Sequence, residues 1–210
     1  MSSDRDEAAR VRERVRDAVV RVRGRAAVIL IDGPSGAGKS SLADALVAGW
    51  PAPGQPRLVR MDDLYPGWSG LDEASAMIGR ELLAPLGAGR SGRWQRWDWQ
   101  AAVPAEWHPV DGAEPVIVEG CGTLSVENAR LADLSIWLDA DDAVRKQRAL
   151  DRDGDTFAAH WNAWQADFDR YVRREHPRQN ADLVLDVTGW PLGAAAASRT
   201  VSARRGNVEA

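Results

Sequence analysis

Apolar runs recur along the chain, and each is short enough to form a single β-strand. They lie at residues 26–31, 115–119, 134–138 and 183–187, and a further strand with two arginines is predicted at residues 57–61. Apolar runs without polar alternation are typical of strands buried on both faces of a parallel sheet. Segments with helical spacing separate them, which indicates βαβ units. The pattern therefore predicts an α/β fold, a three-layer αβα sandwich around a central five-stranded parallel sheet.

The segments before and between these runs predict the helices. Valines at spacings of three and four positions indicate an amphipathic helix over residues 4–23. Helical spacing also marks residues 41–47 and residues 71–86, where Pro85 and Gly87 are expected to break the helix. Helices in these places would cover the two faces of the predicted sheet.

Two further stretches have a less regular pattern. A long polar segment from Asp141 to about Arg174 predicts a helix with a break at residues 153–155, an Asp-Gly-Asp sequence. Residues 87–114 are rich in tryptophan, arginine and glycine and have weak periodicity. We therefore expect them to form an ordered loop region with one short helix.

Composition narrows the class of protein. A chain of 210 residues suits one α/β domain. Its net charge of −4 and interspersed charges argue against a nucleic-acid partner. No apolar stretch approaches the roughly 20 residues of a membrane span, so no membrane partner is expected. The one cysteine, Cys121, cannot form an internal disulfide, which favours a cytoplasmic protein.

The segment Gly33–Ser40 has the pattern G-x-x-x-x-G-K-S of a P-loop, or Walker A motif. It follows an apolar run and opens a helix, which is the context that phosphate binding needs. Its glycines let backbone N–H groups turn towards a phosphate, Lys39 reaches the β- and γ-phosphates, and the Ser40 hydroxyl ligates Mg²⁺. The residues expected to hold the nucleotide are Gly33, Ser35, Gly36, Ala37, Gly38, Lys39, Ser40 and Ser41.

An acidic partner for the metal is expected at the end of a neighbouring strand. Glu119 ends the run at residues 115–119, and Gly120 follows it. The alternative is a carboxylate that only caps the next turn. The chain has no Asn-Lys-x-Asp segment of the kind that reads guanine, so ATP with Mg²⁺ is favoured over GTP.

A second acidic segment follows the run at residues 57–61. It contains Asp62, Asp63 and Tyr65. The carboxyl ends of parallel strands line the ligand crevice, so these acids are expected to face the γ-phosphate. A carboxylate there could accept the proton of an attacking hydroxyl, and Asp62 is favoured over Asp63 as this base. The alternative is an Asx turn that starts the next helix.

With these segments in their order, the chain resembles the uridine kinase family of P-loop small-molecule kinases, which includes phosphoribulokinase-like enzymes. The resemblance implies that Asp62 is the base, Tyr65 the neighbouring aromatic residue and Glu119 the Walker B acid. Trp97 and Asp98 match a Tyr-Asp-Phe element that borders the nucleoside. The histidine that follows this element in the family is absent, because Gln100-Ala101-Ala102 stands there.

The resemblance also implies a helical lid at about residues 145–160. Its catalytic arginines would be found among Arg145, Arg148 and Arg152, with Arg148 and Arg152 favoured. Such arginines neutralise charge that builds on the transferred phosphoryl group. The alternative is a solvated helix with ion pairs three or four residues apart.

These observations predict one P-loop kinase domain over residues 24–190. Residues 1–23 would pack on it as a helix, and residues 191–210 would form a flexible tail. The expected activity is transfer of the γ-phosphate of Mg·ATP to a hydroxyl of a small molecule, with a uridine-like nucleoside favoured. A sugar, sugar acid or vitamin precursor is the alternative acceptor, and a slowly hydrolysing ATP-binding switch is the alternative class. Assembly as a homodimer is left open.

Overall fold

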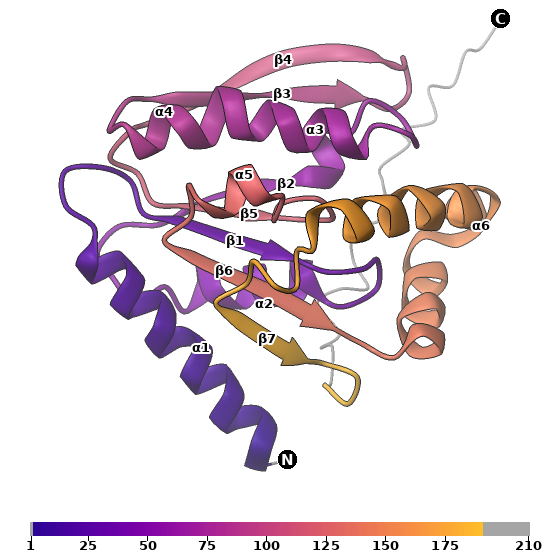
Figure 1. Cartoon of the computed structure of the whole chain (residues 1–210), viewed down its shortest axis with the longest axis horizontal. Coiled ribbons are helices and arrows are strands. Elements are labelled where there is room, and N and C mark those ends of the chain that lie inside the picture. Colours follow the sequence, from indigo (N-terminus) through magenta and orange to yellow (C-terminus); the bar gives the residue numbers. More distant parts are fainter. Residues whose placement is uncertain (1, 191–210) are drawn as a thin grey trace, which may run out of the picture.

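The computed structural model of the chain describes residues 2–190, and it describes side chains from Ala9 onward apart from that of residue 155. The tail predicted at residues 191–210 lies outside this part. All five predicted strands are present, and they form one parallel sheet in the order β2-β5-β1-β6-β7 (Figure 1). Their bounds are β1 Val28–Asp32, β2 Arg57–Arg60, β5 Val116–Glu119, β6 Leu134–Asp139 and β7 Leu183–Asp186.

The sheet is buried on both faces because its strands are apolar at successive positions. In β1, Val28 and Leu30 pack into one core, while Ile29 and Ile31 pack into the other. Side chains of a strand point alternately to the two faces, so each face contributes one side of a core. The chain therefore has the predicted α/β fold, a three-layer αβα sandwich.

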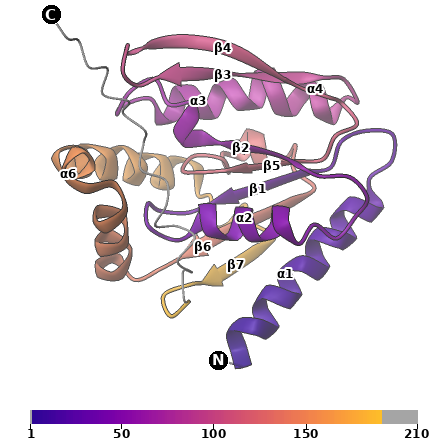
Figure 2. The same cartoon turned by 180° about the vertical axis from the view of Figure 1, so that it is seen from behind.

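Helices α1 (Ser2–Arg21) and α2 (Lys39–Ala48) cover one face of the sheet (Figure 2). The buried positions of α1 include Val11 and Val15, two of the valines that predicted its amphipathic pattern. Leu42 and Leu46 of α2 pack into the same core. The N-terminal helix thus lies on the same domain as the sheet.

The opposite face is covered by a continuous helical segment and by α6. This segment consists of α3 (Leu71–Met77), a π-helical turn η2 (Ile78–Leu83) and α4 (Ala84–Gly87). Pro85 lies in the first turn of α4, directly after the π turn. A proline has no N–H to donate, and the first turn of a helix is where this loss is tolerated. The helix consequently continues through Pro85, where the sequence predicted a break.

Residues 87–114 differ from the sequence-based expectation. They form an antiparallel hairpin of β3 (Gly92–Asp98) and β4 (Val103–Val110), not a loop region with a short helix. The hairpin lies over α3 and α4, on the side away from the sheet (Figures 1 and 2). Most of its side chains are half-buried or exposed, so its strands lack the apolar alternation that marks a strand in sequence.

Helix α6 (Asp142–Glu175) has two arms that meet at Gly154. Gly154 has φ 65° and ψ −155°, a conformation that only glycine adopts readily, and this confirms the predicted break. Figure 1 shows the two arms at a steep angle. Short helices η1 (Met61–Asp63) and α5 (Val126–Ala129) follow β2 and β5. Among the described helices, none has the length and apolar character that crossing a membrane requires.

Candidate active site

The P-loop joins β1 to α2 and is shaped by glycines with positive φ. Gly38 caps the start of α2 with φ 85°. At Gly36, φ is 80° and a Cβ atom would lie 1.9 Å from the carbonyl oxygen of Arg145. No larger residue fits there, because the loop packs directly against the start of α6. The backbone N–H groups of the loop can therefore turn towards a bound phosphate.

Lys39 is held beneath the loop and is 8% exposed. Its ammonium group donates to the carbonyl oxygens of Gly33 at 2.8 Å and Pro34 at 3.0 Å, and it lies 3.6 Å from the sulfur of Cys121. These contacts keep the ammonium group at the mouth of the loop. A buried cation at a helix N-terminus is suited to bind the phosphates of a nucleotide.

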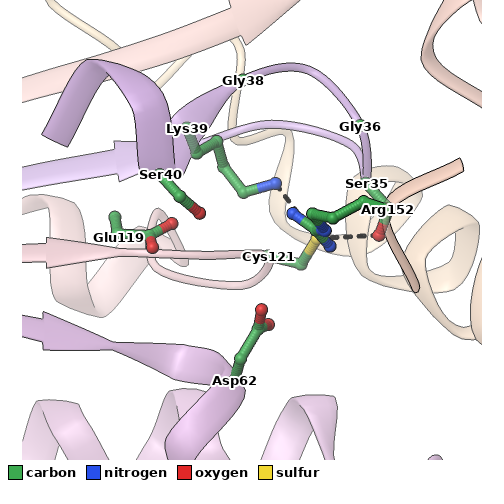
Figure 3. Close-up of a pocket in the computed structure, with 9 residues that line it drawn as sticks. All are labelled: Ser35, Gly36, Gly38, Lys39, Ser40, Asp62, Glu119, Cys121 and Arg152. Atoms are coloured by element: carbon green, nitrogen blue, oxygen red, sulfur yellow. Dashed lines mark hydrogen bonds between the residues drawn. The ribbon is translucent and has the colours of Figure 1, made fainter. Parts of the chain in front are cut away.

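One pocket of about 30 Å³ brings together eight of the residues singled out from the sequence. Figure 3 shows its lining, with the P-loop on one side and Asp62 facing it from the other. The lining residues are Ser35, Gly36, Gly38, Lys39, Ser40, Asp62, Glu119, Cys121 and Arg152. The remaining predicted nucleotide residues, Gly33, Ala37 and Ser41, belong to the same loop and the start of α2 but do not line the pocket.

Glu119 ends β5 beside Ser40, as Figure 3 shows. Its side chain is 4% exposed and accepts a hydrogen bond from Arg60 at 3.0 Å. Burial and the nearby Asp62 raise the pKa of Glu119, while Lys39 and Arg60 act against this shift. The hydroxyl and the carboxylate are oxygen ligands of the kind that Mg²⁺ prefers, so the residues present fit a magnesium–triphosphate group.

Asp62 lies in η1, directly after β2. Its carboxylate points across the pocket towards Lys39 and Ser35 (Figure 3). Among the described residues, none makes a hydrogen bond or an ion pair with this carboxylate, which faces the pocket. Asp63 is its exposed neighbour and does not line the pocket. Of the two acids, Asp62 is the one that lines the pocket, and its role as the base stays a prediction.

The three candidate lid arginines have different places. Arg152 lines the pocket, and its ion pair with Asp153 at 2.7 Å raises the pKa of the guanidinium. Arg145 is buried, donates to Asp142 and Gln165, and lies outside the pocket. Of the three arginines, Arg152 is therefore the one that lines the pocket.

Arg148 does not have the catalytic place that the resemblance implied. Its guanidinium donates to the backbone carbonyls of Val187 at 3.3 Å, Thr188 at 2.8 Å and Trp190 at 3.4 Å. The side chain is bonded to the chain after β7 and does not line the pocket. Its role in the structure is to anchor that segment.

Tyr65 also differs from the implied role beside the acceptor. It is 2% exposed, and its hydroxyl donates to the carbonyl oxygen of Cys121 at 2.8 Å. Burial raises the pKa of this phenol well above its usual value. Tyr65 supports the loop that follows β5 from within the core, and it does not line the pocket.

Trp97 and Asp98, predicted to contact the acceptor, lie at the end of β3 outside the pocket. The Asp98 carboxylate accepts from the backbone N–H groups of Gln100 and Ala101, and these bonds lower its pKa. It therefore organises the hairpin turn. The neighbouring Trp99 comes closer to the site, since its indole N–H donates to the backbone carbonyl of Asp62 at 2.9 Å.

Asp32 is a functional position that sequence reasoning missed. Its buried carboxylate accepts from the backbone N–H groups of Gly33 at 2.7 Å, Gly122 at 3.1 Å and Leu124 at 2.9 Å. The hydroxyl of Tyr171 donates to it at 2.7 Å. Burial raises the pKa of Asp32, against the effect of these hydrogen bonds. Asp32 thereby joins the P-loop, the loop after β5 and α6. In the sequence, the one signal for this residue is its position directly before Gly33 of the P-loop.

Comparisons with known proteins bear on the fold. No protein-family model and no curated protein matches the chain. A solved structure of a possible uridine kinase from Bacillus stearothermophilus is similar, with a TM-score of 0.57 and 21% identity over 84% of this chain and all of that one. A candidate fructose transport system kinase from Silicibacter sp. TM1040 gives a TM-score of 0.54 and 18% identity over 85% of this chain and 98% of the other. The chain has the fold of the uridine kinase-like P-loop kinases.

Proposed function

We propose that the protein is an ATP- and Mg²⁺-dependent kinase that transfers the γ-phosphoryl group to a hydroxyl of a small molecule. The observation that carries this proposal is the place of Asp62, whose carboxylate faces Lys39 and Arg152 across one pocket. A carboxylate on the side opposite the P-loop is placed to act as a base towards an attacking hydroxyl. A kinase needs one, because its acceptor hydroxyl must lose a proton as it attacks.

Each pocket residue has a role in this proposal. Lys39 and the loop N–H groups hold the β- and γ-phosphates, while Ser40 and Glu119 hold the metal. When bound, Mg·ATP supplies the phosphoryl group. Asp62 orients the acceptor hydroxyl and takes its proton, and Arg152 lowers the cost of negative charge on the oxygens in transfer.

The acceptor is proposed to be a nucleoside-like or sugar-like alcohol. Support comes from the two structural neighbours, one described as a possible uridine kinase and the other as a candidate fructose transport system kinase. A uridine-like nucleoside remains the favoured acceptor. A sugar or a vitamin precursor is the alternative.

The test is ADP formation from Mg·ATP with and without a panel of nucleosides, sugars and vitamin precursors. We expect a large rise with one acceptor and formation of its phosphate ester in equal amount. Slow ADP release that no acceptor changes would contradict the proposal and favour a nucleotide-dependent switch.

The role of Asp62 is tested in the same assay. Asp62→Asn is expected to lower kcat by about 10²- to 10⁴-fold with little change in KM for ATP, because the base acts only in the transition state. Asp63→Asn is the matched control and should retain most of the rate, since Asp63 does not line the pocket. A fully active Asp62→Asn variant would remove Asp62 from the mechanism.

A further inference from the structure

The guanidinium of Arg60 has two carboxylate partners, and the proposed roles above do not use it. Its Nη1 atom donates to Oε1 of Glu119 at 3.0 Å, and its Nη2 atom donates to Oδ1 of Asp44 at 2.6 Å. The side chains of Arg60 and Glu119 are 15% and 4% exposed, whereas that of Asp44 is 58% exposed. The bonded groups therefore form a row of three charges, which begins at the surface and ends at a carboxylate of the pocket.

The register of the sheet brings Arg60 and Glu119 together. β2 and β5 are parallel neighbours, and Arg60 is the direct partner of Glu119 in their pairing. Leu58 of β2 and Ile117 of β5 both pack into the core beneath α1 and α2. Arg60 and Glu119 are two residues further along these strands, so they lie on the same face of the sheet. The two side chains thus meet at the ends of their strands, on the face that α2 covers.

The third charge comes from α2, the helix that begins at the P-loop. Ser40 and Asp44 are four positions apart on α2, so they lie on the same side of this helix, one turn apart. Asp44 accepts from the guanidinium of Arg60, and Ser40 lies beside Glu119 (Figure 3). Arg60 consequently links the side of α2 that carries Ser40 to the end of β5 that carries Glu119.

This link leaves Glu119 able to bind a metal ion. A carboxylate has two oxygens with about four lone-pair sites, and the hydrogen bond from Arg60 takes one site of Oε1. A buried carboxylate is costly without a cation partner, and Arg60 supplies one. Groups that hydrogen-bond to a metal-ligating side chain also fix its orientation, and their loss weakens metal binding.

We propose that Arg60 is a positioning residue for the metal: it holds Glu119 beside Ser40, and it thereby determines how strongly Mg²⁺ binds together with the nucleotide. Asp44 in turn holds Arg60. Arg60 does not line the pocket, so it acts through Glu119 and not by contact with the nucleotide. The inference rests on the proposed function for the identity of the ligand, Mg·ATP, but binding is measured without an acceptor and without turnover.

The experiment is calorimetric titration of the full chain with a non-hydrolysable ATP analogue, once with excess Mg²⁺ and once with EDTA. The ratio of the two affinities measures what the metal contributes, and binding of Mg²⁺ to the nucleotide in solution is the same for every variant. Arg60→Met keeps a long apolar stem and loses both hydrogen bonds. It is expected to lower the ratio by about 10- to 100-fold, with little change of affinity in EDTA.

Two further substitutions and a matched control separate positioning from general stability. Arg60→Lys keeps the charge but lacks the fork that reaches two carboxylates, so its ratio should lie between those of Arg60→Met and the unaltered chain. Asp44→Asn should lower the ratio by less than Arg60→Met does, because Arg60 still reaches Glu119. The control is Arg57→Met, since Arg57 is on the same strand, pairs with Glu114 at 3.4 Å and does not line the pocket. Its ratio should equal that of the unaltered chain.

A double variant tests whether Arg60 acts through Glu119. Glu119→Gln removes the charged ligand and should itself lower the ratio. In that background Arg60→Met is expected to lower the ratio little further, because the group that it positions is already gone. A second loss of full size would mean that Arg60 supports the pocket in a general way, and this would contradict the positioning role.

The outcomes separate this inference from the proposed function. An unchanged ratio in Arg60→Met would overturn the inference, and so would a higher ratio, which would mean that Arg60 competes with the metal for Glu119. An unaltered chain whose nucleotide affinity Mg²⁺ does not raise would overturn it as well. If the ratio falls as expected but no phosphate ester forms with any acceptor, the inference stands and the kinase proposal fails. If an ester forms and Arg60→Met keeps the ratio of the unaltered chain, the inference alone fails.

Discussion

Two arginines four positions apart on α6 have different surroundings and should have different effects when removed. Arg152 lines the pocket, whereas Arg148 donates to three backbone carbonyls after β7. Arg152→Ala is expected to lower kcat by about 10²- to 10³-fold, as loss of one group that stabilises transition-state charge does, with little change in melting temperature. Steady-state kinetics and thermal unfolding on the same preparation measure both effects.

Arg148→Ala is the matched control for that experiment. It leaves carbonyl groups without their donor, so it should lower the melting temperature and keep kcat within a few-fold of the unaltered protein. The reverse result, an inactive but stable Arg148→Ala protein, would restore the lid role that the resemblance implied for Arg148 and contradict the division drawn here.

A pH effect is expected at a single carboxylate on the hairpin. Glu106 accepts two hydrogen bonds from Arg96, and these lower its pKa to about 2. The folded pKa lies below the ordinary value of 4.5, so the pair contributes stability above pH 4.5 and loses it as the pH falls from 4.5 towards 2. An NMR titration should place the Glu106 midpoint near 2.

Replacing the partner of Glu106 tests the cause of this shift. In Arg96→Gln the midpoint of Glu106 should return towards 4.5, since the guanidinium supplies the largest effect. A midpoint that stays near 2 without Arg96 would show that another group controls it.

At this scale, the predicted residues that line the pocket are those whose signal in the sequence is local. The P-loop is a contiguous motif, and Glu119 and Asp62 both directly follow or end an apolar run. Asp32 could not be found this way, because its partners are Gly122, Leu124 and Tyr171, which only the folded chain brings to it. The ion pair of Arg60 with Glu119 could not be predicted either, because the fold brings these two distant residues together.

At the scale of elements, the hairpin of β3 and β4 is the element that the pattern of apolar and polar residues did not predict. Strands β3 and β4 are partly solvated, and β4 contains Pro104 and Pro109. Their turn has no Asn-Gly or Asp-Gly pair to mark it, and Ala102 takes φ 53° instead. Burial against α4 and η2 stabilises the hairpin, so long-range packing determines an element that the local pattern leaves undefined.

The bend in α6 gives a prediction for the element as a whole. Gly154 has a conformation that costs other residues about 1–3 kcal/mol, yet a Cβ atom there would meet nothing within 4 Å. Gly154→Ala is therefore expected to favour a straighter α6 without a clash, which moves Arg152 relative to Asp62. We expect kcat to fall by about tenfold or more while the protein stays folded, as measured by kinetics and circular dichroism.

Gly24→Ala is the matched control for the bend. Gly24 also has a positive φ, 74°, with open space around it, but it lies between α1 and β1, away from the pocket. The two substitutions should cost similar stability, and only Gly154→Ala should slow the reaction. Equal kcat values in the two variants would mean that the angle between the arms of α6 does not position Arg152.

For the whole molecule, the alternation of apolar runs and helices was enough to predict the layers and the parallel sheet. The order β2-β5-β1-β6-β7 places β1 in the centre with β5 and β6 beside it, so the P-loop, Glu119 and the start of α6 meet at one edge. Periodicity contains no information about this order. The strand order is determined by the crossover connections and by which apolar faces pack together.

The same arrangement makes the stability of the whole domain depend on one buried pair. The Asp32 carboxylate and the Tyr171 hydroxyl join the P-loop and the loop after β5 to the second arm of α6. Tyr171→Phe removes a hydrogen-bond donor to a buried carboxyl group and should cost about 1–3 kcal/mol. Asp32→Asn should cost more, because backbone N–H groups lose an acceptor in the core. Urea unfolding measures both costs.

The double variant decides whether these effects belong to one network. With Asp32 and Tyr171 in contact, the cost of the double substitution should be less than the sum of the single costs by about 0.5–3 kcal/mol. Tyr65→Phe is the matched control, since its hydroxyl donates to the Cys121 carbonyl and not to Asp32. Its cost should add to that of Asp32→Asn. Additive costs in the Asp32–Tyr171 pair would mean that α6 and the P-loop are held together by apolar packing, with the buried hydrogen bond contributing nothing to their coupling.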